Sequence, residues 1–377
     1  MKIAIFAVDL RIGGVEKSLV NFCNILSAGH EIDLYLMYKN GPLLGKISQK
    51  INVFEIDELK KFVKISNKKC LRASCVRKII KTLFTKFSLT SIAIKKIPDN
   101  KYNQKYDIAI LYQGLNAYLP EFVVKKVYAD KKFVFIHGDF SKYRYLSGIF
   151  KYLKMFDKIV AVSKSCMEPI IRLLKVDQSR VCSVNNYINE AEVLRNADKC
   201  CIEKQHEKFS IVTVARLAKE KGVFRAVKAI QKLIGNGYDI EYIIVGDGPE
   251  HNKISKYIQK NNLEKNILLL GEQTNPYMYI KLADILLIPS YHEAAPLVIS
   301  EALILHVPIL STNTISAKEL IGNNGLVCEN SDKGIFNTLK SLLDNEETYK
   351  RILTNVCSYE YKNNDIKNQI IKFVEKT

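Results

Sequence analysis

Residues 284–303 read DILLIPSYHEAAPLVISEAL, and this stretch indicates the fold. An apolar, strand-like run at residues 284–289 is followed by a short loop and by an apolar helix that is expected to start at Pro296. Proline suits the first helical position because its missing N–H costs nothing there. A strand that leads directly into a helix is typical of parallel sheets, which bind ligands beyond the carboxyl ends of their strands.

Two glutamates flank the start of this helix, Glu293 in the loop and Glu301 inside the helix. The free amides of Leu297 and Val298 would face an anion, which the helix dipole stabilises. Carboxylates on either side of the anion can accept hydrogen bonds from hydroxyl groups. The pattern therefore predicts a nucleotide sugar. The alternative, two solvated surface charges, is the usual case for glutamate, but the apolar neighbours of Glu301 favour a cleft.

Strand-like and helical segments alternate through the whole chain, whose 377 residues exceed a single typical core. This alternation predicts two doubly wound parallel-sheet, Rossmann-like domains that face a central cleft. We expect domains at residues 1–190 and 209–360, a polar linker at 191–208, and a C-terminal helix at 361–377 without a derivable docking site. The expected strands are residues 2–8, 32–37, 51–55, 106–111, 132–137, 158–162 and 180–183, then 210–215, 241–245, 267–270, 284–288, 307–310 and 326–328.

The composition is that of an ordinary globular protein, with 47% apolar and 25% charged residues. The nine cysteines form no CxxC or Cys/His cluster, which favours reduced thiols in the cytoplasm and gives no metal motif. The first apolar run is expected to be a strand and not a signal peptide. No apolar stretch approaches the roughly 20 residues that span a bilayer, so we expect a soluble or peripheral cytoplasmic protein.

The net charge of +18 is concentrated in residues 58–101, which contain 13 basic and two acidic residues. Apolar residues recur there at helical spacing, and a basic amphipathic helix is typical of attachment to an anionic membrane surface. The alternative is a helix that packs its apolar stripe on its own sheet. The basic residues beside the stripe are Arg77, Lys78, Lys81 and Lys86.

Two constellations follow the first strand of each domain. Gly13-Gly14 can let the backbone approach a phosphate before a helix N-terminus, although a Gly-Gly pair is often only a turn. Arg216 supplies a planar cation and Lys221 a mobile one. Together they suit a diphosphate whose negative charge grows as it leaves. Either residue alone would be taken for a surface charge.

Two further constellations lie at strand ends. The turn Gly246-Asp247-Gly248-Pro249 can bring backbone against a flat base, and a well-formed turn with Asp247 as a cap explains it equally well. His137 is either a core histidine or a group that contacts a sugar hydroxyl or moves a proton.

Together these motifs resemble the family 4 retaining glycosyltransferases, which have the two-domain GT-B fold. The resemblance covers most of the chain and is most specific over residues 210–328. The surroundings of His137 and Glu293 are most similar to bacterial enzymes of capsule, O-antigen or exopolysaccharide assembly. The motifs occur in this order: Gly13-Gly14, His137, Arg216 with Lys221, Gly246-Asp247-Gly248-Pro249, and Glu293-x7-Glu301.

The resemblance implies a role for each matched residue. Arg216 and Lys221 would hold the donor diphosphate, and Glu301 would accept hydrogen bonds from the ribose. Glu293 would contact the donor sugar, with His137 beside it near the reacting carbon.

The remaining donor contacts are also implied by the resemblance. The amides near Leu297 and Val298 and the Gly14 loop would meet the phosphates. Family members keep the anomeric configuration, and the departing diphosphate takes the proton of the acceptor. They need no metal or other cofactor, and the chain has no Asp-x-Asp motif.

The chain departs from the family pattern in two places. Residues 185–189 read NNYIN where Asn-Asn-Pro-Ile-Asp is usual, which leaves an acceptor-side role there open. Ala294 and Ala295 follow Glu293 where Gly-Phe or Gly-Leu is more familiar, so the donor-sugar pocket is expected to differ.

The expected function is transfer of a hexose or N-acetylhexosamine from a UDP sugar to a lipid-linked surface polysaccharide. The donor would lie on the second domain, the acceptor on the first, and the two domains would close around them. Residues 58–101 would hold the enzyme at the inner face of the cell membrane. No nucleic-acid partner is expected.

Three alternatives remain. A sugar-nucleotide epimerase shares the fold but would release a free sugar, and a glycogen-type phosphorylase needs a pyridoxal lysine in a longer chain. A nucleic-acid-binding protein would explain the charge of +18, yet the basic stretch offers only Phe62, Phe84 and Phe87 as aromatic partners.

Overall fold

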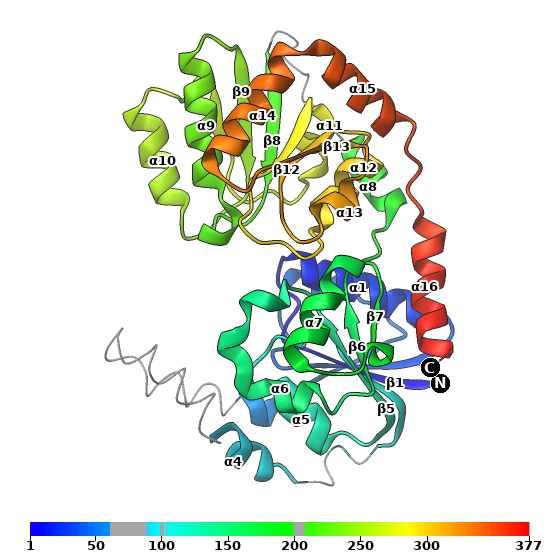
Figure 1. Cartoon of the computed structure of the whole chain (residues 1–377). Coiled ribbons are helices and arrows are strands. Elements are labelled where there is room, and N and C mark those ends of the chain that lie inside the picture. The colour runs from blue at the N-terminus through cyan, green and yellow to red at the C-terminus, as the bar shows by residue number, and fades with distance from the viewer. Residues whose placement is uncertain (61–88, 99–101, 103, 200–207, 377) are drawn as a thin grey trace. The chain divides into compact units, whose positions relative to one another are not determined.

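The protein is described by a computed structural model that covers residues 1–60, 89–98, 102, 104–199 and 208–376. The chain forms two compact units. Unit 1 contains Met1–Tyr187 together with Asn364–Thr377, and unit 2 contains Ile188–Asn363. Each unit is built around one parallel sheet (Figure 1).

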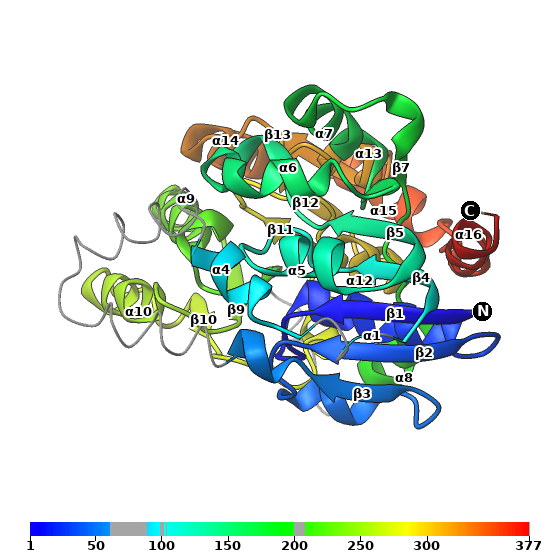
Figure 2. The same cartoon turned by 90° about the horizontal axis from the view of Figure 1, so that it is seen from below.

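The sheet of unit 1 has the order β3-β2-β1-β4-β5-β6-β7, and neighbouring strands all pair in parallel (Figure 2). From β1 the strands follow one another through β2 to β3 at one edge of the sheet. From β4 they follow one another through β5 and β6 to β7 at the other edge. Ligands bind at such a reversal, beyond the carboxyl ends of the strands. The strands are β1 (Lys2–Ala7), β2 (Glu31–Leu36), β3 (Asn52–Glu55), β4 (Tyr106–Leu111), β5 (Ala129–Ile136), β6 (Lys158–Ala161) and β7 (Val181–Ser183).

Helices cover both faces of this sheet. Side chains alternate along a strand, so Ile3 and Ile5 of β1 share a core with α1 and α16. Phe6 points to the opposite face, where its ring contacts that of Phe122 in α5. The described helices of unit 1 are α1 (Gly14–Leu26), α4 (Leu89–Lys95), α5 (Leu119–Lys126), α6 (Phe150–Leu153), α7 (Met167–Leu174) and α16 (Asn363–Glu375).

The C-terminal helix α16, whose docking site was not derivable from the sequence, packs on unit 1. Phe373 contacts the ring of Phe133 at 5.2 Å between centroids. The side chain of Gln369 donates to the carbonyl of Ser183 (3.0 Å) and accepts from the amide of Asn185 (3.2 Å). One glutamine thus satisfies backbone groups at the edge strand β7, which would otherwise be open to pairing with another chain.

Unit 2 has the sheet order β10-β9-β8-β11-β12-β13, again with parallel pairing throughout. Its order reverses between β8 and β11. The strands are β8 (Phe209–Val214), β9 (Ile240–Val245), β10 (Ile267–Leu269), β11 (Ile285–Ile288), β12 (Ile309–Thr312) and β13 (Gly325–Cys328).

Two apolar clusters lie on the two faces of the unit 2 sheet. One packs β8, β9 and β11 against α9 and α14, and the other packs them against α8, α11 and α12 (Figure 1). The helices are α8 (Glu190–Ala197), α9 (Val223–Gly235), α10 (His251–Lys260), α11 (Tyr277–Leu282), α12 (Leu297–Ile304), α13 (Ala317–Ile321), α14 (Asp332–Asp344) and α15 (Glu346–Cys357).

The predicted fold class, two doubly wound parallel sheets, is confirmed. Every expected strand is present within a few residues of its expected bounds. The expectation of a linker at residues 191–208 was wrong in its first part, because α8 runs through Ala197 and buries Val193 in the core of unit 2. Helix α12 begins at Leu297, one residue later than expected, with Pro296 as its N-cap.

The segment at residues 185–189 serves as structural support. Asn186 accepts a hydrogen bond at 2.8 Å from Ser18 of α1, and the Ser18 hydroxyl also pairs with that of Tyr112. Asn189 caps the first turn of α8 with its side chain. These contacts give Asn186 and Asn189 structural roles.

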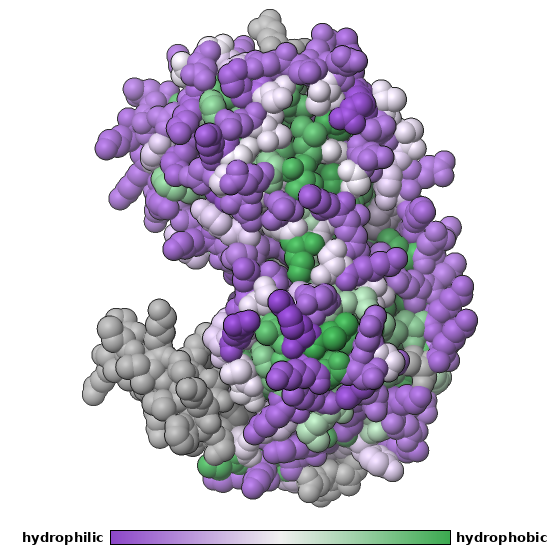
Figure 3. Space-filling view, viewed as in Figure 1, coloured by the Kyte–Doolittle hydropathy of each residue, from purple (hydrophilic) through white to green (hydrophobic). Residues whose placement is uncertain are grey.

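The visible surface is mainly hydrophilic, with apolar residues showing through in patches (Figure 3). None of the helices in the described part of the chain is both long and apolar enough to cross a membrane. The predicted membrane-binding residues Arg77, Lys78, Lys81 and Lys86 lie outside the described residues.

Candidate active site

The loops that follow β8 and β11 lie side by side at the reversal point of the unit 2 sheet, because these two strands are neighbours. The first loop carries Arg216 and Lys221, and the second carries Glu293. The carboxyl ends of parallel strands at a reversal point form the usual ligand crevice of such folds. The structure therefore brings three predicted site residues into one place.

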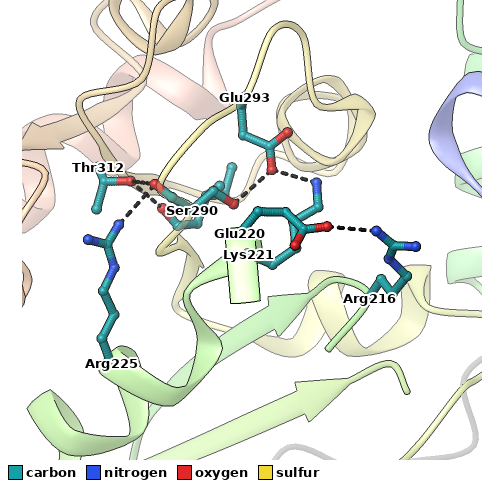
Figure 4. A network of polar contacts seen from close by, with 8 residues as sticks. Arg216, Glu220, Lys221, Arg225, Ser290, Glu293 and Thr312 are labelled. Atoms are coloured by element: carbon teal, nitrogen blue, oxygen red, sulfur yellow. Dashed lines mark hydrogen bonds and ion pairs between the residues drawn. The ribbon is translucent and has the colours of Figure 1, made fainter. Parts of the chain in front are cut away.

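Lys221 and Glu293 form an ion pair, with 2.6 Å between Nζ and Oε1 (Figure 4). Ser290 donates a second hydrogen bond, at 2.7 Å, to the same carboxylate oxygen. The side chains of Lys221 and Glu293 are 27% and 11% exposed. A cation is thus held in a defined position while part of it remains accessible to a ligand.

Arg216 lies on the same loop and pairs with Glu220 at 2.6 Å, with 69% of the arginine side chain exposed. Burial acts to raise the pKa of Glu220, but hydrogen bonds from its own backbone and from Arg216 outweigh it, and the pKa lies below the usual value. Exposed pairs of this kind contribute little to stability. The guanidinium can therefore change partner at small cost.

Arg225, which the sequence reasoning missed, supports the second loop from below. It is 2% exposed and donates to the carbonyls of Pro289 (2.8 Å) and Ser290 (2.9 Å). Its guanidinium lies 3.8 Å from the centre of the Tyr291 ring. Thr312 donates to the Ser290 carbonyl from the neighbouring strand (Figure 4). The backbone that leads to Glu293 is therefore fixed from two sides.

Burial lowers the pKa of Arg225 from its ordinary value. The guanidinium is satisfied by the two carbonyls and by Asn330, which accepts at 2.7 Å. The signal in the sequence was a charged residue within the apolar first turn of α9, between Val223 and Ala226, both of which are buried. A charge at such a position is stable only when it is fully hydrogen-bonded.

The turn at residues 246–249 packs against the loop that carries Arg216. Gly246 has φ +139°, and a Cβ there would lie 1.9 Å from the carbonyl oxygen of Ala215. A Cβ on Gly248 would lie 2.7 Å from the carbonyl oxygen of Leu217. Both glycines are therefore required by the close approach of the Arg216 loop.

Backbone hydrogen bonds join the same two loops. Leu217 donates to the carbonyl of Asp247 at 2.9 Å and accepts from the amide of Glu250 at 2.8 Å. Helix α10 starts at His251, so Pro249 precedes the helix and does not begin it. The turn thus has a structural role in placing Arg216. The predicted contact with a flat base stays a prediction.

Glu301 lies inside α12 and is 4% exposed. Its carboxylate accepts a hydrogen bond from the hydroxyl of Tyr277, and the pKa of Tyr277 is raised by burial and further by this carboxylate. Leu297 and Val298 form the first turn of α12, directly after the Glu293 loop. The helix N-terminus therefore comes directly after the loop that carries Glu293.

His137 follows β5 in unit 1, and its ring packs 4.5 Å from that of Tyr112. Burial lowers the pKa of His137 to about 3, opposed in part by a hydrogen bond to the backbone of Tyr112. The Tyr112 amide already donates to the carbonyl of Phe6, so the ring donates to the Tyr112 carbonyl. Within the described residues, the buried Nε2 of His137 has no hydrogen-bond partner. The imidazole is thus neutral at pH 7, with Nε2 as an acceptor.

A pocket of about 290 Å³ opens beyond the carboxyl ends of β1, β4 and β5 and contains His137. The first turn of α1, which begins at Gly14 with Gly13 as its N-cap, supplies Val15 and Glu16 to the same wall. The structure thus brings the Gly13-Gly14 helix start and His137 together in unit 1. Among the described residues, no group of three or more His, Cys, Asp or Glu side chains is placed to hold a metal ion.

The chain matches the family of glycosyl transferases group 1 over residues 196–356, all of them in unit 2. The N-acetyl-alpha-D-glucosaminyl L-malate synthase of Bacillus anthracis is 28% identical over 53% of this chain and 54% of its own length. An enzyme of Campylobacter jejuni, N-acetylgalactosamine-N,N'-diacetylbacillosaminyl-diphospho-undecaprenol 4-alpha-N-acetylgalactosaminyltransferase, is 25% identical over 93% of this chain and 92% of its own length. The chain spans about half the length of several other curated relatives, between 42% and 54%.

A solved structure, Anabaena HepE in complex with UDP-glucose, superimposes on the whole chain with a TM-score of 0.74 at 16% identity, covering 100% of both chains. Identity this low supports the fold alone. The two parallel sheets, the match of unit 2 to the group 1 family and the full-length likeness to the Campylobacter enzyme agree with the resemblance found in the sequence motifs. Residues 196–356 therefore resemble the group 1 glycosyl transferases, and the chain has the GT-B fold.

Proposed function

We propose that this glycosyltransferase moves a hexose or N-acetylhexosamine from a UDP sugar to a lipid-linked acceptor of a surface polysaccharide, with retention of the anomeric configuration. The relative from Campylobacter is named for transfer to a diphospho-undecaprenol saccharide, and the structural neighbour was solved with UDP-glucose. These names support the donor and acceptor classes. The observation that carries the proposal is the pair of Lys221 with Glu293 beside Arg216 at the reversal point of unit 2.

The proposed donor would change the partners of these side chains. A diphosphate carries more negative charge than a single carboxylate, so it draws Lys221 and Arg216 away from Glu293 and Glu220. Glu293 is then free to accept hydrogen bonds from the hydroxyl groups of the donor sugar. Glu301, in helix α12, would accept hydrogen bonds from the ribose hydroxyls. Donor binding thereby supplies the cations and releases the carboxylate in a single exchange.

The same cations would act in the chemical step. Negative charge grows on the diphosphate as its bond to the sugar breaks, and positioned cations stabilise that charge more than they stabilise the ground state. The acceptor hydroxyl attacks from the face that the diphosphate leaves, and the diphosphate takes its proton. Arg216 and Lys221 would supply the positive charge without a metal ion or other cofactor. Chelation should then leave turnover unchanged.

A panel of UDP-glucose, UDP-galactose, UDP-N-acetylglucosamine and UDP-N-acetylgalactosamine tests the donor assignment. We expect one of them to raise the melting temperature of the purified chain and to be hydrolysed slowly. The Arg216→Ala variant should lose both effects, whereas Lys219→Ala, which removes the same charge from an exposed neighbour on the loop, should keep them. Full donor hydrolysis by Arg216→Ala would refute the assignment of the diphosphate site.

We also propose that the enzyme attaches to the inner face of the cell membrane through residues 58–101, which carry 13 of the basic residues of the chain. Each Lys or Arg near an anionic surface adds roughly 1 kcal/mol of attraction. Sedimentation with phosphatidylglycerol vesicles, but not with phosphatidylcholine vesicles, should therefore occur at low salt. The Arg77, Lys78, Lys81 and Lys86 to Ala variant should lose it.

A further inference from the structure

Two side chains donate to the carboxylate of Glu293, and both use the same oxygen. Lys221 contacts Oε1 at 2.6 Å, and Ser290 donates to Oε1 at 2.7 Å. A carboxylate oxygen has about two lone-pair positions, so these two donors occupy Oε1 fully. Within the described residues, Oε2 accepts no hydrogen bond (Figure 4). A hydroxyl group of a ligand therefore binds at Oε2, or at Oε1 once one of the two donors has left.

The two donors differ in their freedom to leave. Lys221 carries its charge on a flexible four-carbon stem, and 27% of its side chain is exposed. Ser290 is 2% exposed, and its hydroxyl oxygen lies one bond from Cβ, so the backbone determines where that oxygen can reach. Lys221 can follow an anionic ligand, whereas Ser290 leaves Glu293 only if the backbone moves.

The backbone of Ser290 is fixed by residues that do not touch the Glu293 carboxylate. The Ser290 carbonyl accepts from the buried guanidinium of Arg225 at 2.9 Å and from the hydroxyl of Thr312. The amide of the next residue, Tyr291, donates to the carbonyl of Glu220 at 2.8 Å. The hydroxyl of Ser290 is therefore held in place whether or not the ion pair of Lys221 with Glu293 is formed.

This arrangement matters once the proposed donor is bound. Lys221 then moves to the diphosphate, and among the described residues Ser290 is the side chain that still contacts the Glu293 carboxylate. The last torsion of a glutamate side chain has no narrow preference, so a carboxylate without a hydrogen bond would rotate. A side chain that binds a reacting ligand must instead be held close to its productive geometry.

We propose that Ser290 is a positioning residue, whose hydroxyl keeps the Glu293 carboxylate in one orientation for the hydroxyl groups of the donor sugar after Lys221 has left. The role in transfer rests on the proposed function, which assigns the donor sugar to Glu293. Ser290 acts through Glu293 and contacts no donor atom. It therefore affects turnover and the recognition of the sugar, and leaves the binding of UDP unchanged.

The test compares the wild type with Ser290→Ala, which removes the hydroxyl and keeps the carbonyl that binds Arg225 and Thr312. The substrates are the UDP sugar that the donor panel identifies and its analogues that each lack one hydroxyl group of the sugar. In the wild type, loss of the hydroxyl that binds Glu293 should lower kcat/KM for donor hydrolysis about 10- to 100-fold, as expected for one hydrogen bond to a charged group.

In Ser290→Ala the same analogue should differ from the complete donor by less than about threefold, because the carboxylate is no longer held. With the complete donor, kcat should fall about tenfold, the value of one such contact. The affinity for UDP alone, measured by calorimetry, should stay within about twofold of the wild type. A general loss of structure would lower all of these quantities together and would not reduce the difference between the two donors.

Three further variants control for the substitution itself. Ser311→Ala removes a hydroxyl from a serine of β12 that is 1% exposed and donates to the carbonyl of Thr312 at 3.0 Å, so it should behave as the wild type does. Ser290→Thr keeps the hydroxyl and should restore the difference between the donors. Ser290→Cys keeps the size of the side chain but donates weakly, and it takes the place of Ser290→Ala if melting curves show that the latter does not fold.

The outcomes separate this proposal from the proposed donor site. An equal difference between the donors in the wild type and in Ser290→Ala would overturn the role of Ser290. Tighter UDP binding by Ser290→Ala with that difference unchanged would overturn it too, because the serine would then only strengthen the ion pair with Lys221. A wild type that binds no UDP sugar, or that tolerates the loss of every sugar hydroxyl, would instead refute the donor contacts on which this proposal rests.

Discussion

The ammonium of Lys221 and the carboxylate of Glu293 come from loops 72 residues apart in the chain, yet they lie 2.6 Å from each other. Each residue was predicted to contact a different part of the donor. Their pairing means that an anionic ligand competes with Glu293 for the ammonium of Lys221. Under the proposed function, the ion pair would therefore link the binding of the diphosphate to the availability of the Glu293 carboxylate for the donor sugar.

Replacement of Glu293 by Gln should separate binding from catalysis. The variant releases Lys221 from its counter-charge, so we expect UDP to bind a few-fold more tightly, since one negative charge near the diphosphate is gone. Sugar transfer should fall about 100-fold, the loss typical of a missing charge-stabilising contact at a reacting centre. Calorimetric titration with UDP and a transfer assay measure the two effects.

Glu264→Gln is the matched control, because it removes an exposed carboxylate from the same unit. It should change neither quantity. Weaker binding of UDP to Glu293→Gln would show that the ion pair does not compete with the diphosphate.

Replacement of Arg225 should lower both the free energy of unfolding and the affinity of the proposed donor site for UDP. In Arg225→Lys the ammonium cannot reach Pro289, Ser290 and Asn330 at once, so buried acceptors lose their partners. The cost should be about 2–4 kcal/mol of unfolding free energy. UDP affinity should fall as well, because the Glu293 loop loses its support. Urea denaturation and UDP titration measure these effects, with the exposed Arg351→Lys as a control that should change neither.

Gly246→Ala tests whether the turn places Arg216. The new Cβ would meet the Ala215 carbonyl at 1.9 Å, and φ at this position is +139°. We expect a loss of about 2–3 kcal/mol and weaker UDP binding, because the Arg216 loop must move. Gly235→Ala, at the end of α9 with no atom within 4 Å of the new Cβ, should instead be neutral or slightly stabilising. Equal stability of the two variants would contradict this role.

The strands and the loops of the donor site could be predicted from the sequence for a physical reason. Parallel strands are buried on both faces, so a run such as residues 285–288 is apolar throughout and cannot be mistaken for a surface segment. The loops then follow from the rule that ligands bind at carboxyl ends. Glu293, Arg216 and Lys221 could be predicted to lie near one another because each belongs to the loop that follows such a run.

The features that could not be predicted from the sequence depend on contacts between residues that are distant in the chain. The role of Arg225 could not be read from its charge alone, because its three acceptors lie 64 or more residues away. Helix α8 was mistaken for a linker because Val193 and Ala197 are its only buried residues. Two such residues are too few to show the helical repeat of apolar positions in the sequence. Gln113 donates to Glu16 of α1 at 2.9 Å, and no local pattern in the sequence connects these two residues.

The pKa of His137 gives a prediction for stability. The folded pKa is about 3, against an ordinary 6.5, so the unfolded chain binds the proton more readily. Stability contributed by the neutral ring is present above pH 6.5 and is lost as pH falls toward 3. Between pH 6.5 and 5 the loss should be about 2 kcal/mol relative to His137→Gln. Urea unfolding of both proteins across this range measures the difference, and a difference independent of pH would show that the ring is solvated.

Gln369 tests whether α16 closes the edge of the unit 1 sheet. Gln369→Ala removes the acceptor of the Asn185 amide and the donor to the Ser183 carbonyl, which leaves two edge groups of β7 without these partners. We expect a loss of about 1–3 kcal/mol and faster hydrogen exchange at the Asn185 amide. Asn368→Ala, at the adjacent exposed position of the same helix, serves as the control. If both variants exchange the Asn185 amide at the wild-type rate, α16 packs on unit 1 through its apolar face alone, and the edge of β7 is protected in another way.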